Sequence, residues 1–197
     1  MEEKKKKIFA IAGMCGGGKT EAIEYLQEKF HWPKVYLPEA LFEEINKLGL
    51  ERNWKNEKKM RVGLRKKQGK GVFAKLSLDK IKNGLKQSDV VLIESLYSWS
   101  EYKIIKRIFG DAFKVIAIYS SPAVRFSRLR GRKVRPMKTY KEFEERDASE
   151  IEVAEKGGPI AAADYMVINE GTKEEFKEKL DRIMEKEEII KNIAIIE

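Results

Sequence analysis

Residues 13–20 read Gly-Met-Cys-Gly-Gly-Gly-Lys-Thr, a stretch that fits the pattern G-x-x-x-x-G-K-[ST] in full. Its glycines allow the backbone to curl tightly, so that the N–H groups point into a concave nest. Such a nest at the N-terminus of a helix binds phosphate oxygens. We expect Lys19 to reach the β- and γ-phosphates of a nucleotide, and the Thr20 hydroxyl to ligate Mg²⁺.

The segments on either side of this loop have the character that a phosphate site requires. Residues 8–12 form a short apolar run that is typical of a buried parallel strand. After the loop, Ala22, Ile23, Leu26 and Phe30 recur at helical spacing. A glycine-rich turn that matched by accident would have no reason to lie between a strand and a helix, so the sequence predicts a nucleoside-triphosphate site. The predicted nucleotide-binding residues of this loop are Gly13, Met14, Cys15, Gly16, Gly17, Gly18, Lys19 and Thr20.

The composition narrows the class of protein. No apolar run of roughly 18 residues is present, so no membrane span is predicted. A single cysteine offers no disulfide framework, and the N-terminal segment lacks the apolar run of a signal peptide, which together predict a cytoplasmic protein. The net charge of +9 fits either nucleic acid or small polyanions. Because the basic stretches contain few aromatic residues, we favour a small phosphorylated ligand over nucleic acid.

Apolar runs alternate with segments of helical periodicity along the whole chain. This alternation, with no internal repeat, predicts one α/β domain over residues 1–197 with a mostly parallel sheet. The C-terminal residues 189–196 are unusually apolar, and they fit an extra strand or a dimer contact equally well, so the chain is expected to be a monomer or a homodimer. The further predicted strands are 35–37, 89–94, 113–119 and 165–168; the predicted helices are 39–48, 54–67, 72–85 and those that begin at Pro122 and after Thr139 and Thr172.

The predicted strand 89–94 ends in a carboxylate, Glu94. A strand-end acid beside a phosphate loop lies near Mg²⁺ or near the attacking hydroxyl, where it orients a metal-bound water or acts as a base. The alternative is an acid that only caps a neighbouring amide. Tyr97, Ser98 and Glu101 follow closely, and they either line a pocket for the phosphoryl acceptor or are ordinary loop residues.

A cluster of arginines without any acid occupies residues 125–135. Planar guanidinium groups stabilise the negative charge that spreads over a transferring phosphoryl group. On a helix that begins at Pro122, we expect Arg125, Arg128 and Arg132 to share one face, which would bind this charge. The alternative is a solvated basic face.

Two further groups of charged residues are candidates for the acceptor side. Arg61 and Arg65 lie one turn apart on the predicted basic helix 54–67, where they would hold an anionic acceptor group, unless this helix is only an exposed basic one. Arg146 and Asp147 either return to the phosphate site or form an ion pair of their own.

With these residues in place, the chain resembles the nucleotide-kinase branch of P-loop proteins, and more narrowly the dephospho-CoA-kinase-like group of poorly characterised archaeal-type ATP-binding proteins. The chain departs from that group where strand 90–94 ends, because Glu94-Ser95-Leu96-Tyr97 replaces the usual Asp-Gly and arginine. The resemblance rests on the loop 13–20, Leu64-Arg65 with Gly69-Lys70 and Ala74, the strand 90–94, Ser121-Pro122 with Arg125-Phe126 and Arg128-Leu129, Glu142-Phe143 with Arg146-Asp147, Ala163-Asp164-Tyr165, and residues 167–171.

This resemblance implies a P-loop three-layer α/β sandwich, nucleoside-monophosphate-kinase-like, with a five-stranded parallel sheet in the order 2-3-1-4-5. It also implies an acceptor-binding region at 38–85, a mobile arginine-bearing lid at 125–138, and a turn near the nucleotide base that contains Asn169 and Gly171.

The function predicted from these residues is a kinase that uses ATP and Mg²⁺ to phosphorylate a small acceptor. A nucleotide-binding switch or slow NTPase is the alternative, followed by a nucleic-acid-associated ATPase. The predicted catalytic residues are Lys19, Glu94, Arg128 and Arg132, with Arg128 also on the nucleotide; the metal ligands are Thr20 and Glu94, and the acceptor residues are Arg61, Arg65 and Tyr97.

Overall fold

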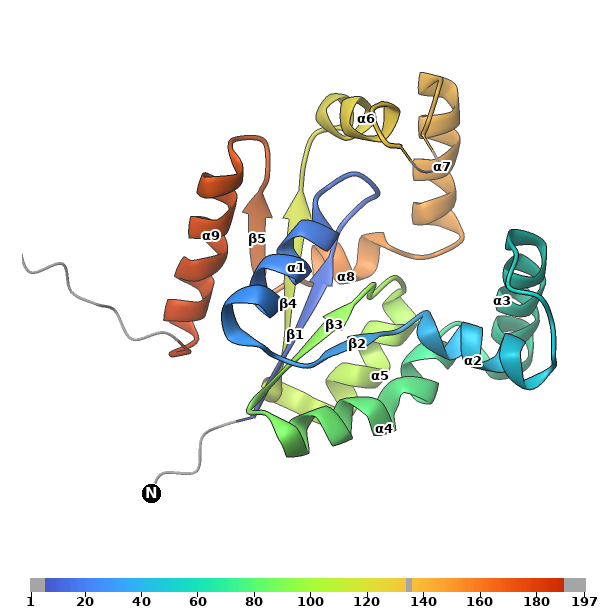
Figure 1. Ribbon diagram of the computed structural model, residues 1–197, viewed down its shortest axis with the longest axis horizontal. Coiled ribbons are helices and arrows are strands. Elements are labelled where there is room, and N and C mark those ends of the chain that lie inside the picture. Colours follow the sequence, from blue (N-terminus) through green and yellow to red (C-terminus); the bar gives the residue numbers. More distant parts are fainter. Residues whose placement is uncertain (1–5, 134–135, 190–197) are drawn as a thin grey trace, which may run out of the picture.

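Five parallel strands form one sheet in the order β2-β3-β1-β4-β5 (Figure 1). The structure, a computed structural model, describes residues 6–133 and 136–189. The strand order confirms the fold expected from the sequence. The glycine-rich loop 13–20 follows the central strand. The strands are β1 (Lys7–Ala12), β2 (Lys34–Tyr36), β3 (Val90–Glu94), β4 (Phe113–Tyr119) and β5 (Tyr165–Ile168).

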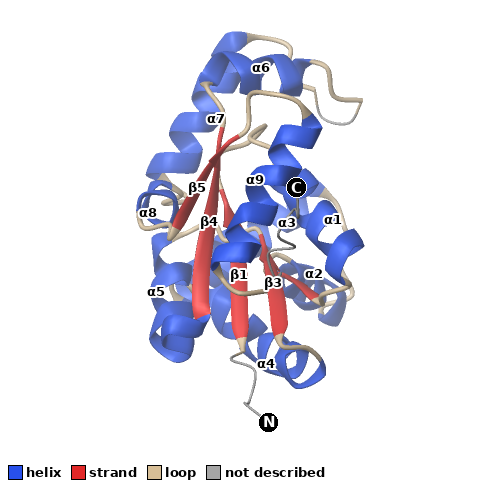
Figure 2. Cartoon of the chain, turned by 90° about the vertical axis from the view of Figure 1, so that its left-hand side faces the viewer, coloured by secondary structure: helices blue, strands red, loops and turns tan. Residues whose placement is uncertain are grey.

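Helices cover both faces of the sheet, which gives three layers (Figure 2). The central strands are apolar on both sides, as buried parallel strands require. The helices α2 (Glu39–Lys47), α4 (Val72–Gln87), α5 (Trp99–Phe109) and the short α8 (Gly157–Ala161) lie on one face. The other face packs against α1 (Lys19–Phe30) and α9 (Lys173–Lys186).

Three further helices lie outside these layers. Helix α3 (Trp54–Gln68) packs on α2 and α4 at one end of the molecule. Helices α6 (Pro122–Arg130) and α7 (Tyr140–Glu152) lie beyond the carboxyl ends of the strands, next to the loop that joins β1 to α1 (Figure 1). A short 3-10 helix, η1 (Gly110–Ala112), precedes β4. The loop therefore lies at the edge of the sheet where α/β proteins bind ligands.

Side-chain caps begin several of these helices. The predicted capping boxes at Thr139 and Thr172 are confirmed. Ser121 occupies the N-cap position of α6 as predicted, but its side chain makes no capping hydrogen bond. Ser98 and Glu101 form a third capping box, at the start of α5, and both are buried. For Ser98 and Glu101, neither alternative holds, because their side chains cap the helix N-terminus instead of lining an acceptor pocket or belonging to an ordinary loop.

The sequence predicts no membrane span, which the helices of the structure test. Among residues 6–133 and 136–189, no helix combines the length and the apolar character that a membrane crossing needs. The apolar segment 189–196 falls almost wholly outside the described residues, so the expectation of an extra strand or a dimer contact stays a prediction.

Leu92 tests the packing of the sheet against α1. This side chain lies in the middle of β3 and is fully buried, so Leu92→Ala should lower the free energy of unfolding by about 2–5 kcal/mol, through lost burial and the cavity left behind. Leu48→Ala is the control, because Leu48 is 62% exposed and its truncation should change stability by less than about 0.5 kcal/mol. Urea denaturation of both variants measures the difference; equal midpoints would contradict the packing described above.

Candidate functional site

The loop between β1 and α1 adopts the curl that its glycines predict. Gly13, Gly16 and Gly18 all have positive φ, which side chains rarely allow. At Gly18 a Cβ atom would also lie 2.2 Å from the Asn169 side-chain nitrogen, and at Gly13 it would lie 2.5 Å from the Ile118 carbonyl oxygen. The glycines therefore allow both the tight turn and the close approach of other segments of the same chain.

Donors from outside the curl hold its carbonyl groups. Arg125 Nη1 donates to the Cys15 carbonyl at 3.3 Å, Arg128 Nη1 to that of Gly16 at 3.5 Å, and Asn169 Nδ2 to that of Gly17 at 2.9 Å. A peptide group whose C=O points outward has its N–H on the opposite side. The N–H groups of Gly16 and Gly18 thus face away from these donors, as a phosphate-binding loop requires, while the Gly17 N–H donates to the Met14 carbonyl at 3.2 Å.

Arg128 and Asn169, both predicted to contact the nucleotide, lie in hydrogen-bond contact with each other. Arg128 Nη2 donates to the Asn169 carbonyl at 3.0 Å, and Nη1 donates to Ser120 Oγ at 2.9 Å. The Asn169 side chain is buried against the loop. Gly171, two residues further on, is exposed, and a Cβ there would meet the Glu175 carboxylate of the α9 capping box.

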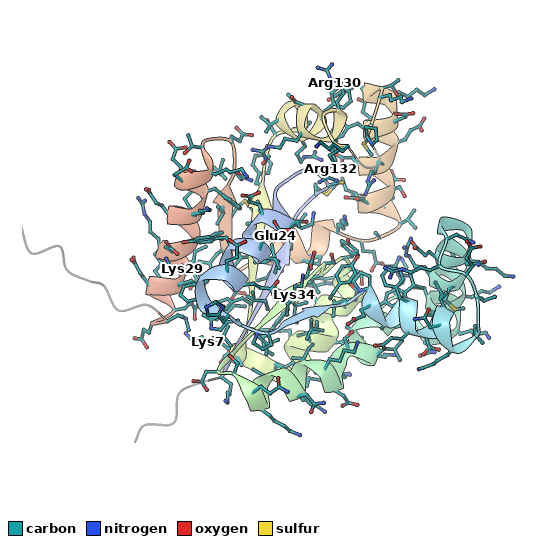
Figure 3. All side chains as sticks on the ribbon, viewed as in Figure 1. Lys7, Glu24, Lys29, Lys34, Arg130 and Arg132 are labelled. Atoms are coloured by element: carbon teal, nitrogen blue, oxygen red, sulfur yellow. The ribbon has the colours of Figure 1, made fainter. Side chains whose placement is uncertain are left out.

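Two of the expectations about the arginine cluster are wrong. Arg125 is buried and makes a two-pronged ion pair with Asp147 on α7, at 2.8 and 2.6 Å, so it supports the loop and does not face a ligand. Helix α6 ends at Arg130, so Arg132 does not share its face. Arg132 is exposed and lies between α6 and the loop, whereas Arg130 points to the outer side (Figure 3). The segment predicted as a lid, 125–138, includes residues 134–135, which lie outside the described part.

Lys19 and Thr20 open helix α1 directly after the curl. Lys19 Nζ donates to the Met14 carbonyl at 2.9 Å, so the side chain folds back over its own loop. Burial, and next the positive charge of Lys156, lower the pKa of Lys19 to about 8. Thr20 is exposed at the positive end of the helix dipole.

Glu94 ends β3 beside the start of the loop, in register with Ile11 of β1. Its carboxylate lies 2.8 Å from Lys34 Nζ, a partner that sequence analysis missed. The parallel register, which places Lys34 opposite Leu92, was the signal that would have found it, because Leu92 and Glu94 share a face of the sheet.

The Thr20 hydroxyl and the Glu94 carboxylate are hard oxygen donors of the kind Mg²⁺ prefers. Among the described residues, no group of three His, Cys, Asp or Glu side chains is arranged to hold a metal. A Mg²⁺ ion at this site would therefore take most of its ligands from phosphate oxygens and water, which is its usual habit in nucleotide sites.

Two of the predicted acceptor residues, Arg61 and Arg65, lie on α3, whereas Tyr97 lies beside Lys156. Burial, and next the charge of Glu94, raise the pKa of Tyr36, which also senses the charge of Arg61. Burial raises the pKa of Tyr97 to about 12, so its hydroxyl stays neutral. Burial lowers the pKa of Arg65, whose Nε is buried without a hydrogen-bond partner among the described residues. An anionic group would satisfy this donor.

Sequence analysis also missed an ion pair against the loop. Glu150 of α7 accepts a hydrogen bond from the Cys15 backbone N–H at 3.1 Å, and it pairs with Lys156 at 2.6 Å. Arg146 donates to the other carboxylate oxygen at 3.2 Å. Arg146 thus contacts the loop indirectly, through Glu150, while Asp147 forms its ion pair with Arg125. The spacing Arg146–Glu150, one helical turn, was a signal for Glu150; no pattern pointed to Lys156.

Comparison with known proteins agrees with this geometry. A family described as AAA domain matches residues 10–153. A UPF0200 protein of Thermococcus gammatolerans is 37% identical over 182 residues, covering 91% of this chain and 94% of the relative. The chain belongs to the UPF0200 family. Another UPF0200 protein, from Methanococcus maripaludis, is 36% identical over 181 residues, covering 91% of this chain and 97% of that relative.

Solved structures share the fold of this UPF0200 chain at low sequence identity. Shikimate kinase from Acinetobacter baumannii in complex with shikimate matches with a TM-score of 0.60 and 17% identity, over 95% of this chain and 97% of that one. A gluconokinase from Sinorhizobium meliloti matches with a TM-score of 0.53 and 14% identity, over 94% and 98%. The fold is therefore the shikimate-kinase-like P-loop fold, and the P-loop domain implies nucleotide binding.

Asp147 tests how α7 supports the loop. Asp147→Ala leaves the buried Arg125 guanidinium without its carboxylate, so the free energy of unfolding should fall by roughly 2–3 kcal/mol, somewhat less than for a fully buried pair because Asp147 is partly exposed. Glu145→Ala is the control on an exposed position of the same helix and should leave stability nearly unchanged. Urea denaturation distinguishes the two; an Asp147 variant as stable as the control would show that the pair does not support the fold.

Proposed function

We propose that this protein is a kinase that moves the γ-phosphoryl group of ATP to a small acceptor. The observation that carries the proposal is the glycine loop itself, whose Cys15, Gly16 and Gly17 carbonyls are held by side chains from outside the loop and whose Met14 carbonyl accepts from Lys19. The membership in an AAA domain family and the fold shared with two small-molecule kinases support it.

The nucleotide would bind along residues 13–20, with Lys19 on the β- and γ-phosphates. Thr20 and Glu94 would hold Mg²⁺, which when bound neutralises charge on the phosphate oxygens. Arg128 and Arg132 would stabilise the charge on the transferring group. Asn169 and Gly171 follow β5 on the side of the nucleotide base, although the Asn169 amide also supports the loop.

The acceptor would bind between the loop and α3. An acceptor oxygen forms a bond to the γ-phosphorus as the bond from that phosphorus to the bridging oxygen of ADP breaks, and ADP leaves with the electron pair. The proton of a hydroxyl acceptor passes to Glu94. Arg61 and Arg65 would hold an anionic part of the acceptor, and Tyr97 would line its site with a neutral hydroxyl.

An anionic acceptor of this kind fits a nucleotide or a dephospho-CoA-like metabolite, bound in the region 38–85. In this proposal residues 1–197 act as one kinase domain whose lid is 125–138. It works as a monomer or a homodimer in the reducing cytoplasm, where the buried Cys15 stays a free thiol.

A slow NTPase or nucleotide switch is the second candidate function. The ion pair from Lys34 to Glu94 favours it, because a carboxylate that is already paired is less available to a metal or an acceptor. A phosphate-transfer assay distinguishes the two functions. A kinase should form a phosphorylated product and hydrolyse less ATP when its acceptor is present, whereas a switch should hydrolyse ATP at a rate that small molecules do not change.

Lys19→Ala tests the nucleotide site. The variant should lose the thermal stabilisation that Mg²⁺ and ATP give to the wild type, and it should lose phosphate transfer to acceptors found in a screen of anionic metabolites. Lys86→Ala, on an exposed position of α4, should bind ATP normally. Unchanged ATP affinity in the Lys19 variant would refute the assignment of the loop.

The pKa of Lys19 predicts a pH dependence. ATP binds the charged ammonium, and because the pKa is lowered to about 8, the charged fraction falls as pH rises through that value. ATP affinity should thus decline by up to about tenfold between pH 7 and pH 9, a window in which an ordinary lysine would stay charged. Because the positive charge of Lys156 is one cause of the lowered Lys19 pKa, Lys156→Met should move the decline to a higher pH. An affinity that stays constant to pH 9 would contradict the prediction.

A further inference from the structure

A buried ion pair, Glu150 with Lys156, lies against the phosphate loop and has no role in the function proposed above. The Lys156 side chain is 8% exposed and that of Glu150 is 12% exposed, and their atoms Nζ and Oε2 lie 2.6 Å apart. Neither charge is needed to build a core, because apolar residues of similar size are usually at least as stabilising. The pair is therefore a candidate for a role in ligand binding.

The partners of Glu150 are the kind that bind phosphate. Its carboxylate accepts a backbone N–H from Cys15 in the loop, a guanidinium N–H from Arg146 and the ammonium of Lys156. Loop amides, arginine and lysine together are the usual donor set for a phosphate group. The Glu150 carboxylate thus occupies a position, and uses donors, that suit a phosphate oxygen.

The charges around the loop do not balance in the absence of a ligand. Lys156 and Arg132 lower the pKa of Lys19, and Glu150 raises it, so the charges of these three side chains act on Lys19. Arg132 is exposed and Arg146 is half-exposed, so the imbalance is that of Lys19 and Lys156 against the one carboxylate of Glu150. Buried cations without enough anions cost free energy, and a polyphosphate would supply the missing negative charge.

Lys156 is held in place by contacts that do not depend on the Glu150 side chain. Its backbone N–H donates to the Glu150 carbonyl at 3.1 Å, and its ammonium lies 4.4 Å from the centre of the Tyr97 ring. The adjacent Glu155 pairs with Lys70 at 2.7 Å, which ties this corner to the segment before α4. If the Glu150 carboxylate swings away, Lys156 stays beside the loop.

We propose that the Glu150 carboxylate holds the place of the terminal phosphate of ATP, and that Lys156 is a second phosphate-binding lysine. This inference rests on the proposed ATP site. On binding, the γ-phosphate displaces Glu150 from the Cys15 amide and takes over the Lys156 ammonium. ADP has no group that reaches this position, so it binds with the pair intact. The pair thereby sets how strongly the site prefers ATP over ADP.

The test compares the dissociation constants of Mg-ATP and Mg-ADP, measured by calorimetry, in four variants of the full chain. Glu150→Gln removes the competing charge and should tighten ATP binding by about tenfold with little change for ADP. Lys156→Met should weaken ATP by about tenfold and ADP much less. The double variant has no unpaired buried charge, so it should fold even if Lys156→Met does not, and it should bind ATP about tenfold more weakly than Glu150→Gln alone. Glu155→Gln is the matched control, because Glu155 lies in the same corner but faces Lys70, and it should leave both constants unchanged.

Each other outcome overturns the inference. If Glu150→Gln binds ATP and ADP in the wild-type ratio, Glu150 does not compete with the γ-phosphate. If the double variant binds ATP as tightly as Glu150→Gln alone, Lys156 is only the structural partner of Glu150. If neither the wild type nor Glu150→Gln binds ATP, the proposed function fails and this inference fails with it, whereas normal ATP binding with an unchanged ATP-to-ADP ratio overturns this inference alone.

Discussion

The site depends on where the peptide groups of residues 14–17 point. Each of these carbonyl oxygens accepts a hydrogen bond from a side chain, supplied in order by Lys19, Arg125, Arg128 and Asn169. A flexible glycine-rich segment would otherwise sample many conformations, at an entropic cost on binding. Four side chains fix the orientation of these peptide groups in the folded chain, so this cost is met when the chain folds.

The same donors join the loop to the rest of the molecule. Arg125 and Arg128 come from α6, and Arg125 continues through Asp147 into α7. Helix α7 then returns to the inside of the loop through Glu150. Helices α6 and α7 thus contact both sides of the loop, and the loop and these two helices form one connected structure.

Most of the fold follows from local sequence. Apolar runs fixed the strand positions, and the Thr139 and Thr172 capping boxes fixed two helix starts, because these signals act over a few residues. The order of the strands came from the family resemblance. The site was less predictable: Glu94 was visible as a strand-end acid, but its partner Lys34 comes from a neighbouring strand. Arg125 illustrates the limit most clearly, because nothing local distinguishes a buried arginine with a distant aspartate from one that faces a ligand.

The anchoring of α6 has a consequence for motion in this protein. A helix whose Arg125 and Arg128 are tied to the loop carbonyls cannot swing away without loosening the loop, so the part of the proposed lid that lies in α6 would move only together with the loop. Helices α2 and α3, in contrast, pack on each other and on α4, and α3 carries Arg61 and Arg65. If the site closes around its ligands, helices α2 and α3 would therefore move toward a nucleotide that stays fixed on the loop.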